Sequence, residues 1–191
     1  MVTRLDTYVG EVLAKLKEKG FDKNTLVIFT SDNGPHMEGG ADPDFFGHNA
    51  ILRGTKRQTH EGGVRVPFVA WGPGMVPAGV VNDHQLAFYD LMPTFCELAG
   101  VEDYVAQYTN PNKEVDYFDG LSFAKTLTGK EGQQAHDFLY WEFEETNQVA
   151  VRMGDWKMVS KAGKPHLYDL SVDVHEDNDI AEQHPDIVKK W

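Results

Sequence analysis

The chain has 191 residues, 41 % hydrophobic and 12 % aromatic, which is enough to bury a core in one domain or one and a half. Its formal net charge of −12 opposes binding to nucleic-acid backbones and to anionic membranes, so we expect neither as a partner. The single cysteine, Cys96, excludes an internal disulfide framework, and no apolar run reaches the roughly 18 residues that a transmembrane helix needs.

The first part of the chain predicts a helix, a strand and a polar turn. Apolar residues recur at helical spacing over residues 3–19, and Gly20 follows where a helix commonly ends. Leu26–Thr30 is apolar without alternation, which is typical of a strand buried on both faces of a parallel sheet. Ser31–Gly34 come directly after it, and ligands of open α/β sheets bind just beyond the carboxyl ends of strands.

The middle of the chain predicts a long loop and then shorter regular elements. Residues 35–63 are rich in Gly, His and polar groups, and loops of this length are often functional. Val64–Trp71 predicts a second strand, at an edge or irregular position because Pro67 lacks a backbone donor. Asp90–Leu98 predicts a short helix with Pro93 in its first turn, and residues 102–120 predict a loop.

The C-terminal third predicts a small antiparallel sheet. Short strand-like runs follow one another from residue 136, with Gly154-Asp155 as a two-residue hairpin turn, and residues 180–191 predict a closing helix. We therefore divide the chain into an α/β part at 1–100, connecting loops at 101–135 and an antiparallel part at 136–191. The predicted strands are Phe138–Phe143, Gln148–Met153, Trp156–Ser160 and His166–Leu170.

Asp32 and Asn33 are the strongest candidates for metal ligands. A carboxylate and an amide oxygen on adjacent residues suit a hard cation such as Ca²⁺ or Mg²⁺, and Gly34 permits a tight turn that aims both at one point. Asp-Asn-Gly is also ordinary turn chemistry, so the residues alone leave both readings open. Two ligands fill only part of a shell of about six to eight, so further ligands must come from elsewhere.

Lys56 is the candidate for contact with an anionic group. A flexible ammonium on this glycine-bearing loop could stabilise charge on a leaving oxygen, although Arg53, Lys56 and Arg57 could equally form a solvated basic patch. His36 and His48 could bond a substrate oxygen or be plain loop residues, and His36 is the better candidate because it lies three residues after Asn33. We find no nucleophile elbow, no phosphate-binding glycine loop and no zinc HExxH motif.

Taken together, several segments resemble the arylsulfatase-type sulfatases of the alkaline phosphatase superfamily. The resemblance covers nearly the whole chain and is carried by the order and spacing of the segments. They are Thr25–Gly34, Leu52–Lys56, Glu61–Pro67, Asp90–Thr94, Leu139–Glu142 and Arg152–Lys157.

This resemblance implies an α/β domain with a parallel sheet, followed by a small antiparallel sheet and a C-terminal helix. It also implies hydrolysis of sulfuric esters, with Asp32 and Asn33 as the later pair of ligands of one Ca²⁺ and Lys56 in contact with the sulfate. The family's nucleophile is a formylglycine made in a Cys/Ser-x-Pro-x-Arg motif, and no such motif occurs here. We therefore expect this chain to be the C-terminal portion of a longer enzyme, and to be inactive by itself.

Three further expectations follow from the resemblance. The substrate would be a sulfated small molecule or glycan, and the intact protein would be periplasmic or secreted, although this chain carries no signal peptide. Surface left uncovered in the 191-residue chain would favour self-association. The alternatives are a phosphatase or phosphodiesterase of the same superfamily, and a non-catalytic structural or binding module.

Overall fold

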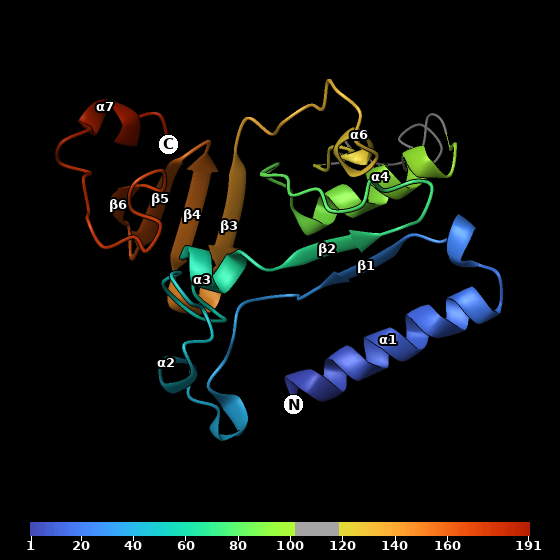
Figure 1. The fold of residues 1–191 in the computed structure, drawn as a ribbon. Helices are drawn as coiled ribbons and strands as arrows, with labels where there is room; N and C mark the ends of the chain where they lie inside the picture. The colour runs from blue at the N-terminus through green and yellow to red at the C-terminus, as the bar shows by residue number, and fades with distance from the viewer. Residues whose placement is uncertain (102–118) are drawn as a thin grey trace, which may run out of the picture. The chain divides into compact units, whose positions relative to one another are not determined.

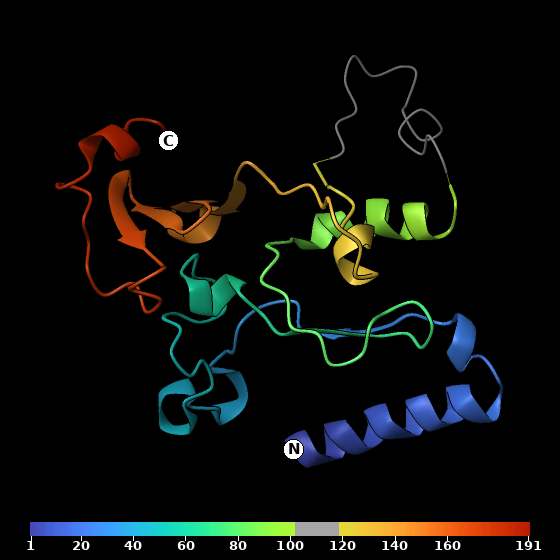
Figure 2. The ribbon, with the colours of Figure 1, turned by 45° about the horizontal axis from the view of Figure 1, so that its top comes forward.

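A computed structural model describes residues 1–101 and 119–191, so residues 102–118 of the predicted connecting loop at 101–135 lie outside the described residues. Contacts divide the chain into two compact units (Figures 1 and 2). Unit 1 comprises residues 1–29 and 69–136, and unit 2 comprises residues 30–68 and 137–191. The antiparallel C-terminal part thus shares a unit with residues 30–68, which we had assigned to the α/β part at 1–100.

Unit 1 begins with the predicted helix, which is confirmed as α1 (Val2–Glu18). It ends where expected, because Gly20 adopts the left-handed conformation (φ 71°) and Phe21 N–H donates to Leu16 O. The 3₁₀ turn η1 (Asp22–Asn24) leads into strand β1 (Val27–Thr30). None of the residues in α1 is buried.

β1 pairs with β2 (Phe68–Trp71) in a two-stranded sheet. Thr30 Oγ1 donates to Pro67 O, while Gly72 lies against Thr25 O at the other end, so the strands run in opposite directions (Figure 1). The predicted parallel arrangement therefore does not apply to this pair. The expected burial of β1 on both faces is also wrong, since Phe29 is 41 % exposed.

The rest of unit 1 packs around a buried carboxylate. η3 (Phe88–Asp90) runs into α4 (Leu91–Leu98), which packs against α6 (Ala124–Leu127), and α4 confirms the helix predicted at 90–98. Asp90 accepts hydrogen bonds from Ala87 N–H (2.7 Å) and Leu121 N–H (2.8 Å), and His136 Nε2 lies 2.9 Å from it. The Asp90-Leu91-Met92-Pro93-Thr94 segment therefore has a structural role at the start of α4, where the buried Thr94 Oγ1 donates to Asp90 O.

Unit 2 contains the predicted antiparallel meander, which is confirmed. Its four strands pair in the order β3-β4-β5-β6, and the β4–β5 hairpin turns at Gly154-Asp155 as expected. Ala150, Val159 and Tyr168 form its core. The strands are β3 (Leu139–Phe143), β4 (Gln148–Met153), β5 (Trp156–Lys161) and β6 (Lys164–Asp169), with the 3₁₀ turn η4 (Glu144–Thr146) after β3.

The remaining elements of unit 2 are short. η2 (Glu38–Gly40) and α2 (Pro43–Phe46) lie in the predicted long loop. α3 (Glu61–Val64) is one helical turn, so the predicted strand at 64–71 is wrong in its first half. The expected C-terminal helix at 180–191 shortens to α7 (Pro185–Val188).

Candidate active site

The Asp32–Asn33 turn lies where the sequence predicts, directly after the carboxyl end of β1. Ser31 Oγ donates to Asn33 O (2.9 Å), and Asn33 Nδ2 donates to Gly34 O (2.8 Å). The Asn33 amide nitrogen is thus occupied locally, which leaves its oxygen to act as a ligand. Asp32 is exposed and makes no hydrogen bond or ion pair to any described residue.

Gly34 fixes this turn against the Glu61-Gly62-Gly63 segment. Its N–H donates to Gly63 O (3.0 Å), and a Cβ at Gly34 would lie 1.8 Å from Gly62 O. A Cβ at Gly62 would lie 2.5 Å from Arg53 O in the same way. Real Cβ contacts are never this short, so the two glycines are required by close backbone approach.

Lys56 belongs to the same part of the molecule. Its N–H donates to Pro35 O (2.8 Å), so its backbone lies beside the residue that follows the Asp32–Gly34 turn. The residue is half-buried and forms no ion pair with any residue that the structure describes. The Lys56 ammonium group is therefore not neutralised by a carboxylate of any described residue.

The candidate histidines are placed differently. His36 is half-buried, and its Nδ1 accepts a hydrogen bond from Glu38 N–H (3.2 Å), so its other nitrogen remains for a substrate. His48 stacks on Phe46 at 5.2 Å between ring centroids. His84 and His136 belong to unit 1.

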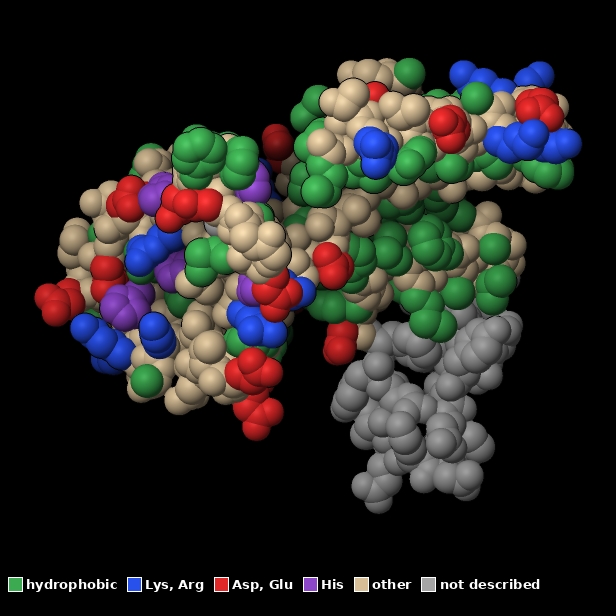
Figure 3. Space-filling model, turned by 90° about the horizontal axis from the view of Figure 1, so that it is seen from below, with side chains coloured by type: hydrophobic (Ala, Val, Ile, Leu, Met, Phe, Trp, Pro, Cys, Tyr) green, Lys and Arg blue, Asp and Glu red, His purple; other side chains and the backbone are tan. Residues whose placement is uncertain are grey.

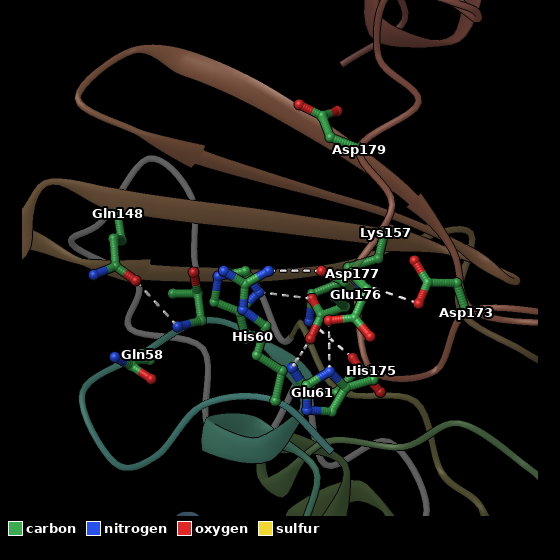
Figure 4. Close-up of polar contacts among 12 residues, drawn as sticks. Gln58, His60, Glu61, Gln148, Lys157, Asp173, His175, Glu176, Asp177 and Asp179 are labelled. Atoms are coloured by element: carbon green, nitrogen blue, oxygen red, sulfur yellow. Dashed lines mark hydrogen bonds and ion pairs between the residues drawn. The ribbon is translucent and has the colours of Figure 1, made fainter. Parts of the chain in front are cut away.

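A buried ionic network holds the segment that contains α3. Glu61 is 1 % exposed, and its Oε1 lies 2.9 Å from Lys157 Nζ (Figure 4). Its Oε2 lies 2.9 Å from Arg152 Nη1. Lys157 is fully buried, and its ammonium lies 4.1 Å from the centre of the Trp141 ring. Both cations come from the antiparallel sheet, so the sheet anchors the loop that carries Lys56.

Glu176 supplies a second anchor from the C-terminal segment. It is also fully buried, its Oε2 accepts the Glu61 N–H (2.8 Å), and its Oε1 lies 3.0 Å from His60 Nδ1 (Figure 4). Arg53 Nη1 donates to the Glu176 backbone oxygen (2.6 Å). Residues 53–61 are thereby attached at two points to the end of the chain.

The network shifts the proton affinity of its members. Burial raises the pKa of the Glu61 carboxyl, but Lys157 and Arg152 lower it by more, so this pKa lies below its ordinary value of 4.5. Burial lowers the pKa of the Lys157 ammonium, and the Glu61 carboxylate opposes that shift. Glu61 is therefore held in its charged form at neutral pH.

The donor set fits a hard cation in kind but is incomplete. Asp32 offers a free carboxylate and Asn33 a free amide oxygen, the donor types that Ca²⁺ and Mg²⁺ prefer. Over the described ranges, no cluster of three or more His, Cys, Asp or Glu side chains could hold a metal by itself. These two residues would thus be a minority of the ligands.

Comparison with known proteins decides the family. The sulfatase family model matches residues 1–101, which include the turn, Lys56 and the Glu-Gly-Gly segment. The chain belongs to the sulfatase family. Its α/β fold with a small antiparallel sheet matches sulfatase structures, and hydrolysis of sulfuric esters is the activity of the family.

Individual sulfatases match over most or all of the chain. An N-acetylgalactosamine-6-O-sulfatase of Bacteroides thetaiotaomicron is 30 % identical over 100 % of this chain and 39 % of its own length. Mouse N-acetylgalactosamine-6-sulfatase is 35 % identical over 82 % of this chain and 27 % of its own length. The chain thus spans well under half the length of these relatives.

Solved sulfatase structures share the fold. PsFucS1 sulfatase from Pseudoalteromonas superposes with a TM-score of 0.75 at 30 % identity, covering 98 % of this chain and 40 % of that one. Ps i-CgsB, solved in complex with a neocarrahexaose, superposes with a TM-score of 0.78 at 27 % identity, covering 100 % of this chain and 40 % of that one. In the part of the sulfatase chain that the structure describes, no helix is long and apolar enough to cross a membrane.

The ionic network is the feature that the sequence did not reveal. Glu61, Arg152 and Lys157 were noted only within segments that carry the family resemblance. The sequence contains one hint. Arg152 in β4 and Lys157 in β5 occupy positions where the alternation of the strand predicts a buried apolar side chain. Their partner lies 91 to 96 residues away in sequence, which no local pattern reveals.

Proposed function

We propose that this chain forms part of a sulfatase that hydrolyses sulfated glycans. The observation that carries the proposal is the backbone bond between Lys56 and Pro35, which places the backbone of Lys56 beside the residue that follows the Asp32–Gly34 turn. Family membership supports it, as do the similarity to an N-acetylgalactosamine-6-O-sulfatase and to a structure solved in complex with a neocarrahexaose. The nucleophile would come from sequence outside these 191 residues, because no Cys/Ser-x-Pro-x-Arg motif occurs in them.

In this proposal each residue has a separate role. Asp32 and Asn33 would contribute two oxygen ligands to one Ca²⁺, with Mg²⁺ as a possible substitute. When bound, the cation would offset the negative charge of the sulfate group. Lys56 would hold a sulfate oxygen and stabilise the charge that develops on the leaving oxygen, while His36 would donate to a substrate oxygen through its free nitrogen.

The location and assembly of the protein belong to the same proposal. We infer that the intact protein is periplasmic or secreted, where sulfated glycans are met. We also infer that the 191-residue chain self-associates, because α1 buries none of its residues and Leu5 and Val12 are 50 % and 56 % exposed. Sedimentation velocity tests this: a monomer at micromolar concentrations would contradict it.

The decisive experiment measures sulfate release by the intact protein from an aryl sulfate and a sulfated glycan. Lys56→Ala should lower kcat by roughly 10²–10³ with a smaller change in KM, as for other groups that stabilise developing charge. Lys23→Ala, an exposed lysine of η1, is the control and should leave kcat unchanged. Unchanged turnover in Lys56→Ala would return Lys56 to the solvated surface.

Two further assays separate the alternatives. A phosphate ester hydrolysed faster than the sulfate ester, with two metal ions bound per protein, would favour a phosphatase or phosphodiesterase. The 191-residue chain alone should release no sulfate even with excess Ca²⁺, because it encodes no nucleophile. Release that Asp32→Ala abolishes would show that the chain is a complete enzyme.

A further inference from the structure

The loop between the two candidate site segments is closed at its neck. It leaves at Pro35, whose carbonyl accepts the Lys56 N–H, and Asn49 Nδ2 donates to Gly54 O near its return. The loop between Pro35 and Lys56 is therefore attached at both of its ends to the backbone beside the proposed sulfate site. All of these residues belong to unit 2.

This loop exposes an apolar and aromatic surface. Phe45 is 79 % exposed and Phe46 64 %, with Met37 at 66 % and Ile51 at 65 %. On the face drawn in Figure 3, exposed hydrophobic side chains lie among histidine, acidic and basic ones. Four large apolar side chains left in water within 15 residues form a patch of the kind that marks a binding surface. We call Met37, Phe45, Phe46, His48 and Ile51 the aromatic loop surface.

The rings of this surface are held in a definite arrangement. Phe46 and His48 stack with their planes 11° apart, and Phe45 meets Phe46 edge-on at 4.9 Å between centroids. Asp42 Oδ1 accepts the N–H groups of Asp44 (3.0 Å) and Phe45 (3.1 Å), which fixes the start of α2. The surface is thus organised before any ligand arrives, so binding costs little ordering.

We propose that the aromatic loop surface binds a pyranose ring of the sulfated glycan, with the sulfate group held at Lys56. This inference rests on the proposed function and names the subsite for the sugar. A pyranose presents a face of C–H groups that packs flat on an aromatic ring, while its hydroxyls stay in water. Such contact is indifferent to charge, which matters because the chain carries a net charge of −12 and Asp42 and Asp44 flank the rings.

The test compares glycan recognition with sulfate recognition in the intact protein. The probe is an oligosaccharide containing N-acetylgalactosamine 6-sulfate, measured by sulfate release and by calorimetric binding. Phe45→Ala/Phe46→Ala should raise its KM and Kd roughly tenfold, which corresponds to about 1.4 kcal/mol, because the contact between the sugar and the two rings is lost. Inhibition by inorganic sulfate should change less than about twofold. Phe138→Ala, another exposed phenylalanine of unit 2, is the matched control.

The outcomes separate this inference from the proposed function. A wild-type protein that binds the oligosaccharide through Phe45 and Phe46 but releases no sulfate would refute the function and keep the subsite. A wild-type enzyme whose KM is unaltered in the double variant would overturn the subsite alone. Equal weakening of glycan binding and inorganic sulfate inhibition would also overturn it, because the loop would then act only by supporting the sulfate site. Circular dichroism checks that the variants fold.

Discussion

Asp90 in unit 1 and Glu61 in unit 2 are both only 1 % exposed, and the two carboxylates are satisfied in different ways. In unit 1, Asp90 is bonded by two backbone N–H groups and His136. In unit 2, Glu61 is bonded by the full charges of Lys157 and Arg152. The first arrangement joins residues up to 46 positions apart through neutral backbone donors and a histidine, whereas the second joins oppositely charged side chains 91 to 96 positions apart.

The difference shows in which unit the loss of the buried carboxylate should lower stability more. The two backbone N–H groups that bond Asp90 are neutral donors, and leaving such a group without an acceptor costs about 1–3 kcal/mol. Lys157 is fully buried, so its ammonium has no access to water once Glu61 is gone. Unit 2, which contains the candidate active site, should therefore depend more steeply on its carboxylate than unit 1 does.

The largest effect is expected from Glu61→Ala. Removing one partner leaves an uncompensated buried ammonium, which costs about 3–5 kcal/mol. Hydrogen exchange should show faster exchange in β4 and β5 and unchanged exchange in α4 and α6. The control is Glu145→Ala, an exposed glutamate of η4, for which we expect less than about 0.5 kcal/mol. Equal loosening of both units would show that the two carboxylates are not independent.

Asp90→Ala should act in the opposite unit and more weakly. It leaves the N–H groups of Ala87 and Leu121 without their acceptor, at a cost of about 1–3 kcal/mol for the buried groups. Exchange should rise in α4 and α6 while β4 and β5 keep their protection. A loss larger than that of Glu61→Ala would reverse the comparison.

Acid should destabilise unit 2 through the protonation of Glu61. The pKa of Glu61 is below its ordinary value of 4.5 in the folded state, so the folded protein binds this proton less readily than the unfolded chain does. The stabilisation is complete above the unfolded value and is lost as pH falls below 4.5 through the folded pKa, at about 1.4 kcal/mol for each unit of difference. Denaturant titrations from pH 6 to pH 3 measure this loss. Glu61→Gln should flatten the dependence, and an unaltered slope in that variant would assign it to other carboxylates.

The smallest effect is expected in α1. Gly10 lies within this exposed helix, and a Cβ there would meet nothing within 4 Å. Gly10→Ala should therefore stabilise unit 1 by about 0.5–1 kcal/mol, because alanine loses less backbone entropy in a helix. Thermal unfolding should shift upward by roughly 1–4 °C. Gly34→Ala is the contrasting variant. It should destabilise unit 2, because the added Cβ would lie 1.8 Å from Gly62 O.

Local patterns predicted the elements whose physics is local. The apolar spacing of residues 3–19 gave α1, Gly20 ended it, and the short runs after residue 136 gave the four-stranded meander with its Gly154-Asp155 turn. Residues 61–67 misled the prediction because two glycines and a valine carry little helical signal, and tertiary contacts with Gly34 and Arg53 made a helical turn there. The direction of β2 depends on how the chain returns, which periodicity does not encode.

For the candidate site, too, local patterns predicted some features and missed others. The position of Asp32–Asn33 at the end of β1 followed from a polar turn after an apolar run. The proximity of Lys56 to that turn came from family resemblance, and the structure supplies its backbone contact. The Glu61–Lys157 pair was missed because its members lie 96 residues apart, and a lysine in a strand is usually exposed.

The discontinuous make-up of unit 2 has a consequence for the order of events on the ribosome. Glu61 leaves the peptidyl transferase centre 115 residues ahead of Glu176, whose carboxylate bonds its backbone. At about 5–20 residues per second, that interval lasts roughly 6 to 23 s. β3 to β6 are made only in the later part of this interval, so the turn and Lys56 lack the complete sheet that anchors them until the interval ends. The candidate catalytic segment is therefore synthesised well before the sheet on which its final conformation depends.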